Sequence, residues 1–114
     1  MREYVIIMPR TAGYACEWLR TALLDAYGGY TEHEATGAWK DPTGAVIFDH
    51  NAVFTVATDH ENALQVLRSM ARITGRIGDQ QSVYLRDGYG NVEFVEIPYL
   101  PYPYQEMDDA IAEA

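Results

Sequence analysis

The sequence has 114 residues, of which 48% are hydrophobic and 22% charged. A chain of about this length folds as one domain, and the composition excludes a disordered protein. The formal charge of −9 disfavours direct nucleic-acid binding, because an acidic surface repels phosphate backbones. Such acidity suits a basic protein partner or imitation of nucleic acid, and it also serves solubility alone.

The N-terminal segment predicts a buried strand. Its apolar run, residues 4–8, is far shorter than the roughly 20 residues that a membrane span requires, and it lacks a signal-peptide layout. The single cysteine, Cys16, cannot form an internal disulfide. We therefore expect a cytoplasmic protein with no membrane association.

A first helix follows over residues 15–26. Its apolar residues share one helical face at the spacing i, i+3, i+4, i+7, i+8 and i+11, and they are Ala15, Trp18, Leu19, Ala22, Leu23 and Ala26. Gly28-Gly29 predicts its end, since glycine accepts the left-handed conformation common at helix C-termini.

The next two segments predict a hairpin. Residues 30–36 and 45–57 are rich in strand-forming side chains, and residues 37–44 between them contain Asp-Pro and flanking glycines. The polar triplet 49–51 interrupts the second arm, so we expect a bulge or a split into two strands there.

A second helix is expected from residue 58. Thr58 and Glu61 have the spacing of a capping box, and an apolar stripe follows up to Gly75–Gly78. Residues 82–86 and 92–97 then predict a second hairpin around the turn-forming loop 87–91.

This order predicts an α+β fold of the ferredoxin-like type, β-α-β-β-α-β, with two helices on one face of an antiparallel sheet of four or five strands. The other sheet face is solvated, covered by a partner, or paired with a second copy. Its large side chains favour a homodimer. We expect a single domain over residues 1–97 and a Pro/Tyr-rich acidic tail over 98–114.

No strong catalytic, metal or nucleotide motif is present, so we predict no catalytic residue, metal or cofactor. His33, His50 and His60 each neighbour a carboxylate, but they lack metal-binding spacing and are best explained as exposed polar residues. Cys16 lies near a helix start, where a thiol can be activated, yet a small buried cysteine is the simpler interpretation.

Several residues are candidates for ligand or partner contact. Trp39 in the first hairpin either closes the end of the core, which we favour, or binds a ligand, together with Gln81 and Tyr84. An arginine stripe on the second helix forms either a solvated face or a site for an acidic partner, and tail tyrosines offer a docking surface; these residues are Arg68, Arg72, Arg76, Tyr99, Tyr102 and Tyr104.

Three short motifs, over residues 28–31, 37–44 and 80–84, carry a resemblance. They are a glycine-rich step after the first helix, a G-x-W-x-D-x-x-G turn, and a glutamine-containing segment before the last hairpin. With them, residues 4–97 resemble a family of small prokaryotic and phage proteins of unknown function. The resemblance implies a ferredoxin-like domain and no particular activity.

The missing motifs, small size and acidity favour a non-enzymatic accessory or inhibitory protein, phage-encoded and binding a host protein. Two alternatives remain open. One is a small-molecule-binding protein or simple enzyme with a pocket at a dimer interface near Trp39. The other is a structural subunit of a homo-oligomer.

Overall fold

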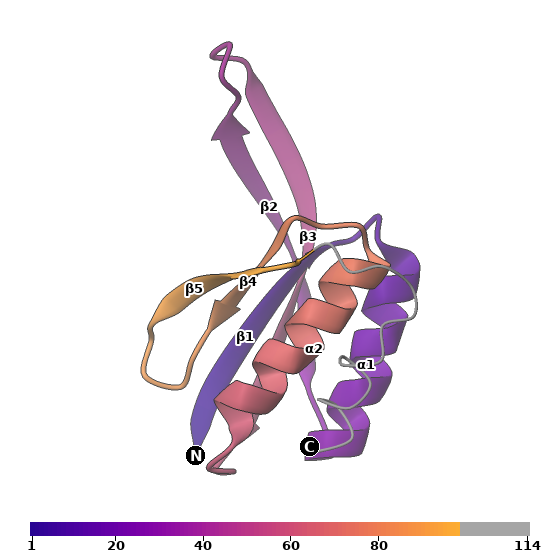
Figure 1. The fold of residues 1–114 in the computed structure, drawn as a ribbon, viewed down its shortest axis with the longest axis vertical. Helices are drawn as coiled ribbons and strands as arrows, with labels where there is room; N and C mark the ends of the chain where they lie inside the picture. Colours follow the sequence, from indigo (N-terminus) through magenta and orange to yellow (C-terminus); the bar gives the residue numbers. More distant parts are fainter. Residues whose placement is uncertain (99–114) are drawn as a thin grey trace.

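The structure, a computed structural model, describes residues 1–98 and has the predicted α+β architecture (Figure 1). Its elements in chain order are β1 (Arg2–Pro9), α1 (Gly13–Tyr27), β2 (Thr31–Lys40), β3 (Val46–Thr58), α2 (Ala63–Ile77), β4 (Ser82–Arg86) and β5 (Val92–Glu96). The five strands form one antiparallel sheet in the order β2-β3-β1-β4-β5, and both helices cover one face. The ferredoxin-like prediction is confirmed, with β5 as the additional strand.

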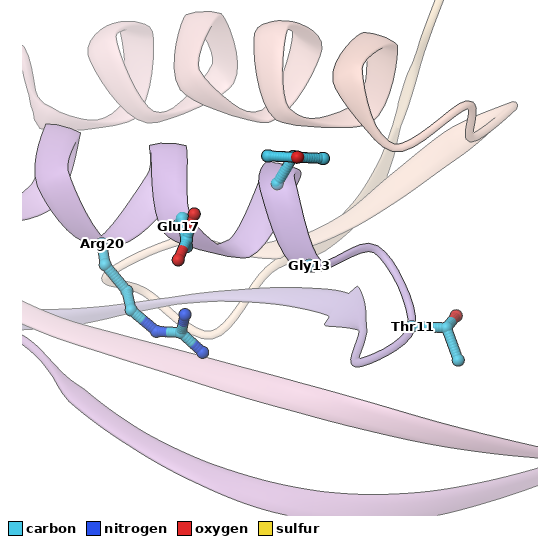
Figure 2. A pocket seen from close by; sticks show the side chains of 5 residues that line it. Thr11, Gly13, Glu17 and Arg20 are labelled. Carbon is cyan, nitrogen blue, oxygen red and sulfur yellow. The ribbon is translucent and has the colours of Figure 1, made fainter.

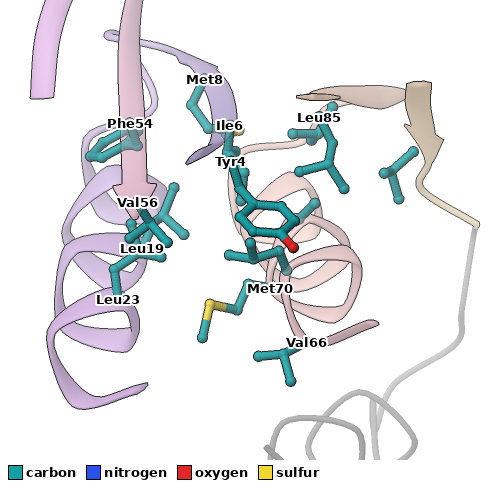
Figure 3. Close-up of a cluster of buried hydrophobic side chains, with 14 of the residues drawn as sticks. Tyr4, Ile6, Met8, Leu19, Leu23, Phe54, Val56, Val66, Met70 and Leu85 are labelled. Atoms are coloured by element: carbon teal, nitrogen blue, oxygen red, sulfur yellow. The ribbon is translucent and has the colours of Figure 1, made fainter. Parts of the chain in front are cut away.

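The core lies between this covered face and the two helices (Figure 3). Because side chains alternate across a strand, every second residue of β1 and β3 points to the helices. Phe54 and Met8 are among the largest fully buried side chains, and Leu19 and Leu23 of α1 pack with them. The apolar stripes predicted for both helices are therefore the faces that contact the sheet.

The helix boundaries differ from the predictions at both helix starts, and α1 begins two residues early, at Gly13. Gly28 ends α1 in the left-handed conformation, with φ of 77°, as predicted. The α2 helix begins at Ala63 and not at the proposed capping box. Thr58 instead accepts a hydrogen bond from the backbone N–H of His60 at 3.1 Å, which shapes the turn before the helix.

The first hairpin is longer and more regular than predicted. Strand β3 pairs with β2 without interruption from Thr55 to Val46, so the expected bulge or split at residues 49–51 is wrong. Residues 37–40, expected in the turn, belong to β2. The Asp41 carboxylate explains this: it accepts hydrogen bonds from the backbone N–H groups of Thr43 and Ala45, at 2.9 and 3.0 Å, and closes a tight turn one residue beyond the ladder.

The distal half of this hairpin, residues 36–50, stands clear of both helices (Figure 1), and we call it the arm. Burial in β3 stops abruptly: residues 46–50 are exposed, whereas Ala52, Val53 and Phe54 are buried. Trp39 lies in the arm and is 51% exposed. The expectation that Trp39 closes the end of the core is therefore wrong.

No helix within residues 1–98 is long and apolar enough to cross a membrane. The predicted Pro/Tyr-rich tail, apart from Pro98, lies outside the described residues.

The burial pattern predicts contrasting effects of truncating two phenylalanines. Phe54→Ala removes a core side chain that is 1% exposed, and we expect it to lower the free energy of unfolding by about 3 to 5 kcal/mol. Phe94→Ala, at 66% exposure on β5, should cost less than about 1 kcal/mol. Urea denaturation of both variants tests this, and equal losses would contradict the assigned core.

Candidate functional site

A hollow of about 500 Å³, open to solvent, lies beside the N-terminal half of α1. This volume falls within the roughly 300 to 1,000 Å³ typical of small-molecule sites. Figure 2 shows Thr11 on the loop before α1 and the side chains of Glu17 and Arg20 projecting from the helix. The lining residues are Thr11, Gly13, Tyr14, Glu17 and Arg20.

The geometry of the hollow follows from the start of α1. Tyr14, Glu17 and Arg20 follow one another at intervals of three residues, so successive members are neighbours on the helix surface. Gly13 contributes no side chain, and no atom lies within 4 Å of the position where its Cβ would be, so this end of the hollow stays open.

An ion pair fixes the wall between α1 and β2. Arg20 donates from Nε and Nη2 to the two carboxylate oxygens of Glu32, at 2.7 and 2.9 Å. This bidentate contact raises the pKa of Arg20 and lowers the pKa of Glu32. Next to it, Arg10 pairs with Glu34 at 2.8 Å.

These pairs leave an unpaired carboxylate and a free ring in the hollow. Among the described residues, neither Glu17 nor Tyr14 has a hydrogen-bond or ion-pair partner. Tyr14 is 84% exposed. The hollow therefore presents a negative charge and an aromatic ring side by side, a combination suited to a cationic ligand that carries a flat ring system.

Cys16 is not part of this site. It is 2% exposed, and its thiol donates to the Pro9 carbonyl oxygen at 3.6 Å. Burial raises the pKa of the thiol, which disfavours the reactive thiolate. The interpretation of Cys16 as a small buried residue is confirmed.

The histidines lie apart from the hollow's lining. The His60 ring packs against Tyr27 with centroids 5.5 Å apart, and His33 and His50 are exposed on the hairpin. Within residues 1–98, no three His, Cys, Asp or Glu side chains come together in a way that would hold a metal ion.

The arginine stripe of α2 makes contacts within the chain. Arg68 binds Glu93 of β5 with two hydrogen bonds, at 2.6 and 3.2 Å. Arg72 donates to the Ser69 hydroxyl at 3.4 Å, and Arg76 donates to the carbonyl oxygen of Pro98. A role for this stripe in partner contact stays a prediction.

The other predicted contact residues do not meet within one chain. Tyr84 lies in a row across the uncovered sheet face and packs edge-on against Phe94, with centroids 5.8 Å apart. Across the sheet, Tyr84 pairs with Ile7, Ile7 with Val53, and Val53 with His33 of β2. Trp39 lies six residues, or roughly 20 Å, further along β2 than His33. Gln81 is exposed just before β4. Three further candidates lie outside the described residues: Tyr99, Tyr102 and Tyr104.

Sequence reasoning missed the hollow altogether. Glu17 lies off the apolar stripe of the predicted helix, and Tyr14 comes directly before that helix; this position was the one sequence signal for either residue. The pairing of Arg20 with Glu32 joins residues 12 apart and depends on how α1 lies over β2.

Comparison with solved structures identifies the fold. A phage SAM lyase without ligand matches with a TM-score of 0.61 and 9% identity, covering 87% of this chain and 91% of the other. A phage SAM lyase in complex with S-methyl-5'-thioadenosine matches with a TM-score of 0.62 and 10% identity, covering 87% and 92%. No protein-family model matches the sequence, and neither does any curated protein.

These neighbours correct the predicted function. They are enzymes, which conflicts with a non-enzymatic accessory or inhibitory protein acting on a host protein. The link to small phage proteins is supported at the level of the fold. Because no family model matches, membership of the motif family of unknown function stays a prediction.

The ion pair between Arg20 and Glu32 predicts that the stability of the protein depends on pH. Because the pKa of Glu32 in the folded chain is below its ordinary value of 4.5, its stabilising effect is complete above that pH and is lost as the pH falls through the folded-state pKa. Glu32→Gln should therefore lower the free energy of unfolding by about 0.5 to 1 kcal/mol at pH 7, since both partners are partly exposed.

Urea denaturation between pH 7 and pH 2 measures the free energy of unfolding of the wild type and of Glu32→Gln. The stability lost in Glu32→Gln should shrink toward zero at the acidic end of this range. The control Glu61→Gln changes an exposed position and should match the stability of the wild type at every pH. A loss that persists unchanged in acid would contradict the assigned ion pair.

Proposed function

We propose that this chain is an enzyme that binds S-adenosylmethionine and cleaves it to S-methyl-5'-thioadenosine. The observation that carries the proposal is the match to phage SAM lyases over almost the full length of both chains. A likeness restricted to one motif of the fold would leave the position of the site undefined. Here the likeness covers 87% of this chain.

The charge of the protein supports this substrate. S-adenosylmethionine carries a sulfonium cation, and at neutral pH its amino and carboxylate groups cancel, so its net charge is positive. A chain with a formal charge of −9 attracts such a molecule over a long range. The thioether product is neutral, so the same field does not retain it after cleavage.

The contents of the hollow match the chemical groups of the substrate. We assign the Tyr14 ring to stack on the adenine and the Glu17 carboxylate to face the sulfonium. Within residues 1–98 neither group has a partner, and the two are neighbours three residues apart on α1. Arg20 is held by Glu32, so it acts as a fixed wall of the hollow and not as a second charge that would repel the cation.

The proposed reaction balances without water. The carboxylate oxygen of the substrate's own amino-acid portion forms a bond to Cγ while the bond from Cγ to the sulfonium sulfur breaks. The electron pair of the broken bond stays on sulfur, which leaves as a neutral thioether, and the remaining fragment is a five-membered lactone. Opposite charges are cancelled in this step, so a site that removes water from the reacting groups accelerates it.

The proposed function includes a cytoplasmic location for this chain, because S-adenosylmethionine is used in the cytoplasm.

Two variants test the site. We expect Glu17→Gln to lower kcat/KM for formation of S-methyl-5'-thioadenosine by roughly 10- to 100-fold, chiefly through a higher KM, because the bound substrate cation loses its facing charge. Tyr14→Ala should weaken binding of S-methyl-5'-thioadenosine by roughly 10-fold, through loss of the stacking ring. Chromatographic assay of the product and calorimetric titration with the thioether measure these two effects.

Glu61→Gln is the matched control, because it removes an exposed carboxylate on the turn before α2 and should leave both quantities unchanged. The assignment of the hollow is wrong if the purified chain is active and Glu17→Gln is equally active. The proposed function itself is wrong if the wild-type chain neither forms nor binds S-methyl-5'-thioadenosine.

A further inference from the structure

After β5 the chain passes from the sheet to the C-terminal end of α2. Ile97 donates its backbone N–H to the carbonyl oxygen of Gln81 at 3.0 Å. The Ile97 side chain lies over Gly75 of α2, where an added Cβ would come within 2.6 Å of it. Arg76 then donates to the carbonyl oxygen of Pro98. These contacts place the start of the tail, residues 99–114, beside the last turn of α2.

The face of α2 that points away from the core is basic. Arg68, Arg72 and Arg76 recur every four residues, so they form one stripe along the helix, and α2 contains no acidic residue. The charge of Arg68 is matched by Glu93. Within residues 1–98, the partner of Arg72 is the neutral Ser69 hydroxyl, and no carboxylate pairs with it. Arg72 therefore keeps an uncompensated positive charge on an acidic protein.

From these observations we propose that the tail docks along the arginine stripe of α2 in the same chain, running from the C-terminal toward the N-terminal end of the helix. The stripe is then an internal docking site and not a surface for a foreign acidic protein. The inference does not depend on the proposed cleavage of S-adenosylmethionine, because no arginine of the stripe lines the hollow.

The charge and the aromatic rings of the tail complement the stripe. Residues 99–114 contain no lysine or arginine and four acidic residues, which are Glu106, Asp108, Asp109 and Glu113. The three tyrosines of the tail can stack on guanidinium groups, a contact that Arg2 and Tyr89 make in this chain at 4.3 Å. The surface beside α1 instead offers Glu17, whose carboxylate repels an acidic segment. Charge therefore favours α2 over the hollow.

The length of the tail also fits the stripe. Its prolines favour a polyproline II path, which advances about 3.1 Å per residue, so residues 99–104 span roughly 19 Å. The stripe from Arg76 to Arg68 is roughly 12 Å long, because an α-helix rises about 1.5 Å per residue. With about three residues per turn, Tyr99 and Tyr102 share one side of such a path and can face the same helix.

Attachment to the same chain favours the tail over a foreign partner. A segment joined directly to its docking site has an effective concentration on the order of 1 mM. The preformed polyproline path also reduces the conformational entropy that is lost on docking. A separate acidic protein has neither advantage, so it would have to displace the tail before it could bind the stripe.

A spin label on the tail of the full chain tests the proposal. The label is attached at Gln105→Cys in a Cys16→Ala background, and it broadens the NMR signals of nearby backbone amides. We expect the largest loss of signal in the N-terminal half of α2, residues 63–70, because residue 105 reaches that part of the stripe. Most of the signal should return in about 1 M salt, where the screening length falls to about 3 Å.

Two charge reversals separate the stripe from the rest of the surface. Arg72→Glu should lower the ratio of docked to free tail roughly 10-fold, because it removes a stacking partner and reverses a charge. Arg86→Glu is the matched control, since it makes the same change at an exposed position of β4 and should keep the wild-type pattern. The salt measurement needs neither variant, so a folding defect in Arg72→Glu does not remove the test.

Three results would overturn the proposal. One is broadening that is centred on the hollow or the arm, or is spread evenly over the chain. Another is broadening of α2 that neither salt nor Arg72→Glu reduces. The third comes from a mixture of spin-labelled chain and isotope-labelled chain without the spin label. If α2 of the isotope-labelled chain broadens as strongly there, the tail docks on a second copy and not on its own helix.

Discussion

The uninterrupted pairing of β3 with β1 on one side and β2 on the other organises this molecule. Because the register has no bulge, the same alternation of side chains runs along all 13 residues of β3. At one end, residues such as Phe54 contact the helices and form the core. At the other end the helices are absent, and Phe48, on the same face of the strand, meets solvent. One strand thus provides both the core and the arm.

Much of the fold could be predicted because the signals were local. The apolar stripes of both helices, the left-handed stop at Gly28 and the turn-forming loop 87–91 each depend on residues close together in the sequence. The error in the first hairpin had a clear physical cause. Polar residues at 49–51 were taken to break the strand, but they lie where the strand leaves the core, and an exposed position tolerates them without a bulge.

The candidate site could not be predicted from motifs. The wall formed by Arg20 and Glu32 depends on the packing of α1 over β2, which no local pattern encodes. The absence of catalytic motifs also misled the functional prediction. A sulfonium is an intrinsically good leaving group, so the cleavage we propose needs a positioned substrate and little specialised chemistry from the protein. Such a site leaves few characteristic residues in a sequence.

The central claim is that the hollow beside α1 is the site for an adenosyl thioether. The most direct measurement is a two-dimensional NMR titration of the full chain with S-methyl-5'-thioadenosine. The account predicts saturable shifts concentrated at the backbone amides of residues 11–20, with small changes in β4 and β5. Shifts centred on another surface, or none at millimolar ligand, a level on the order of the weakest specific binding, would contradict it.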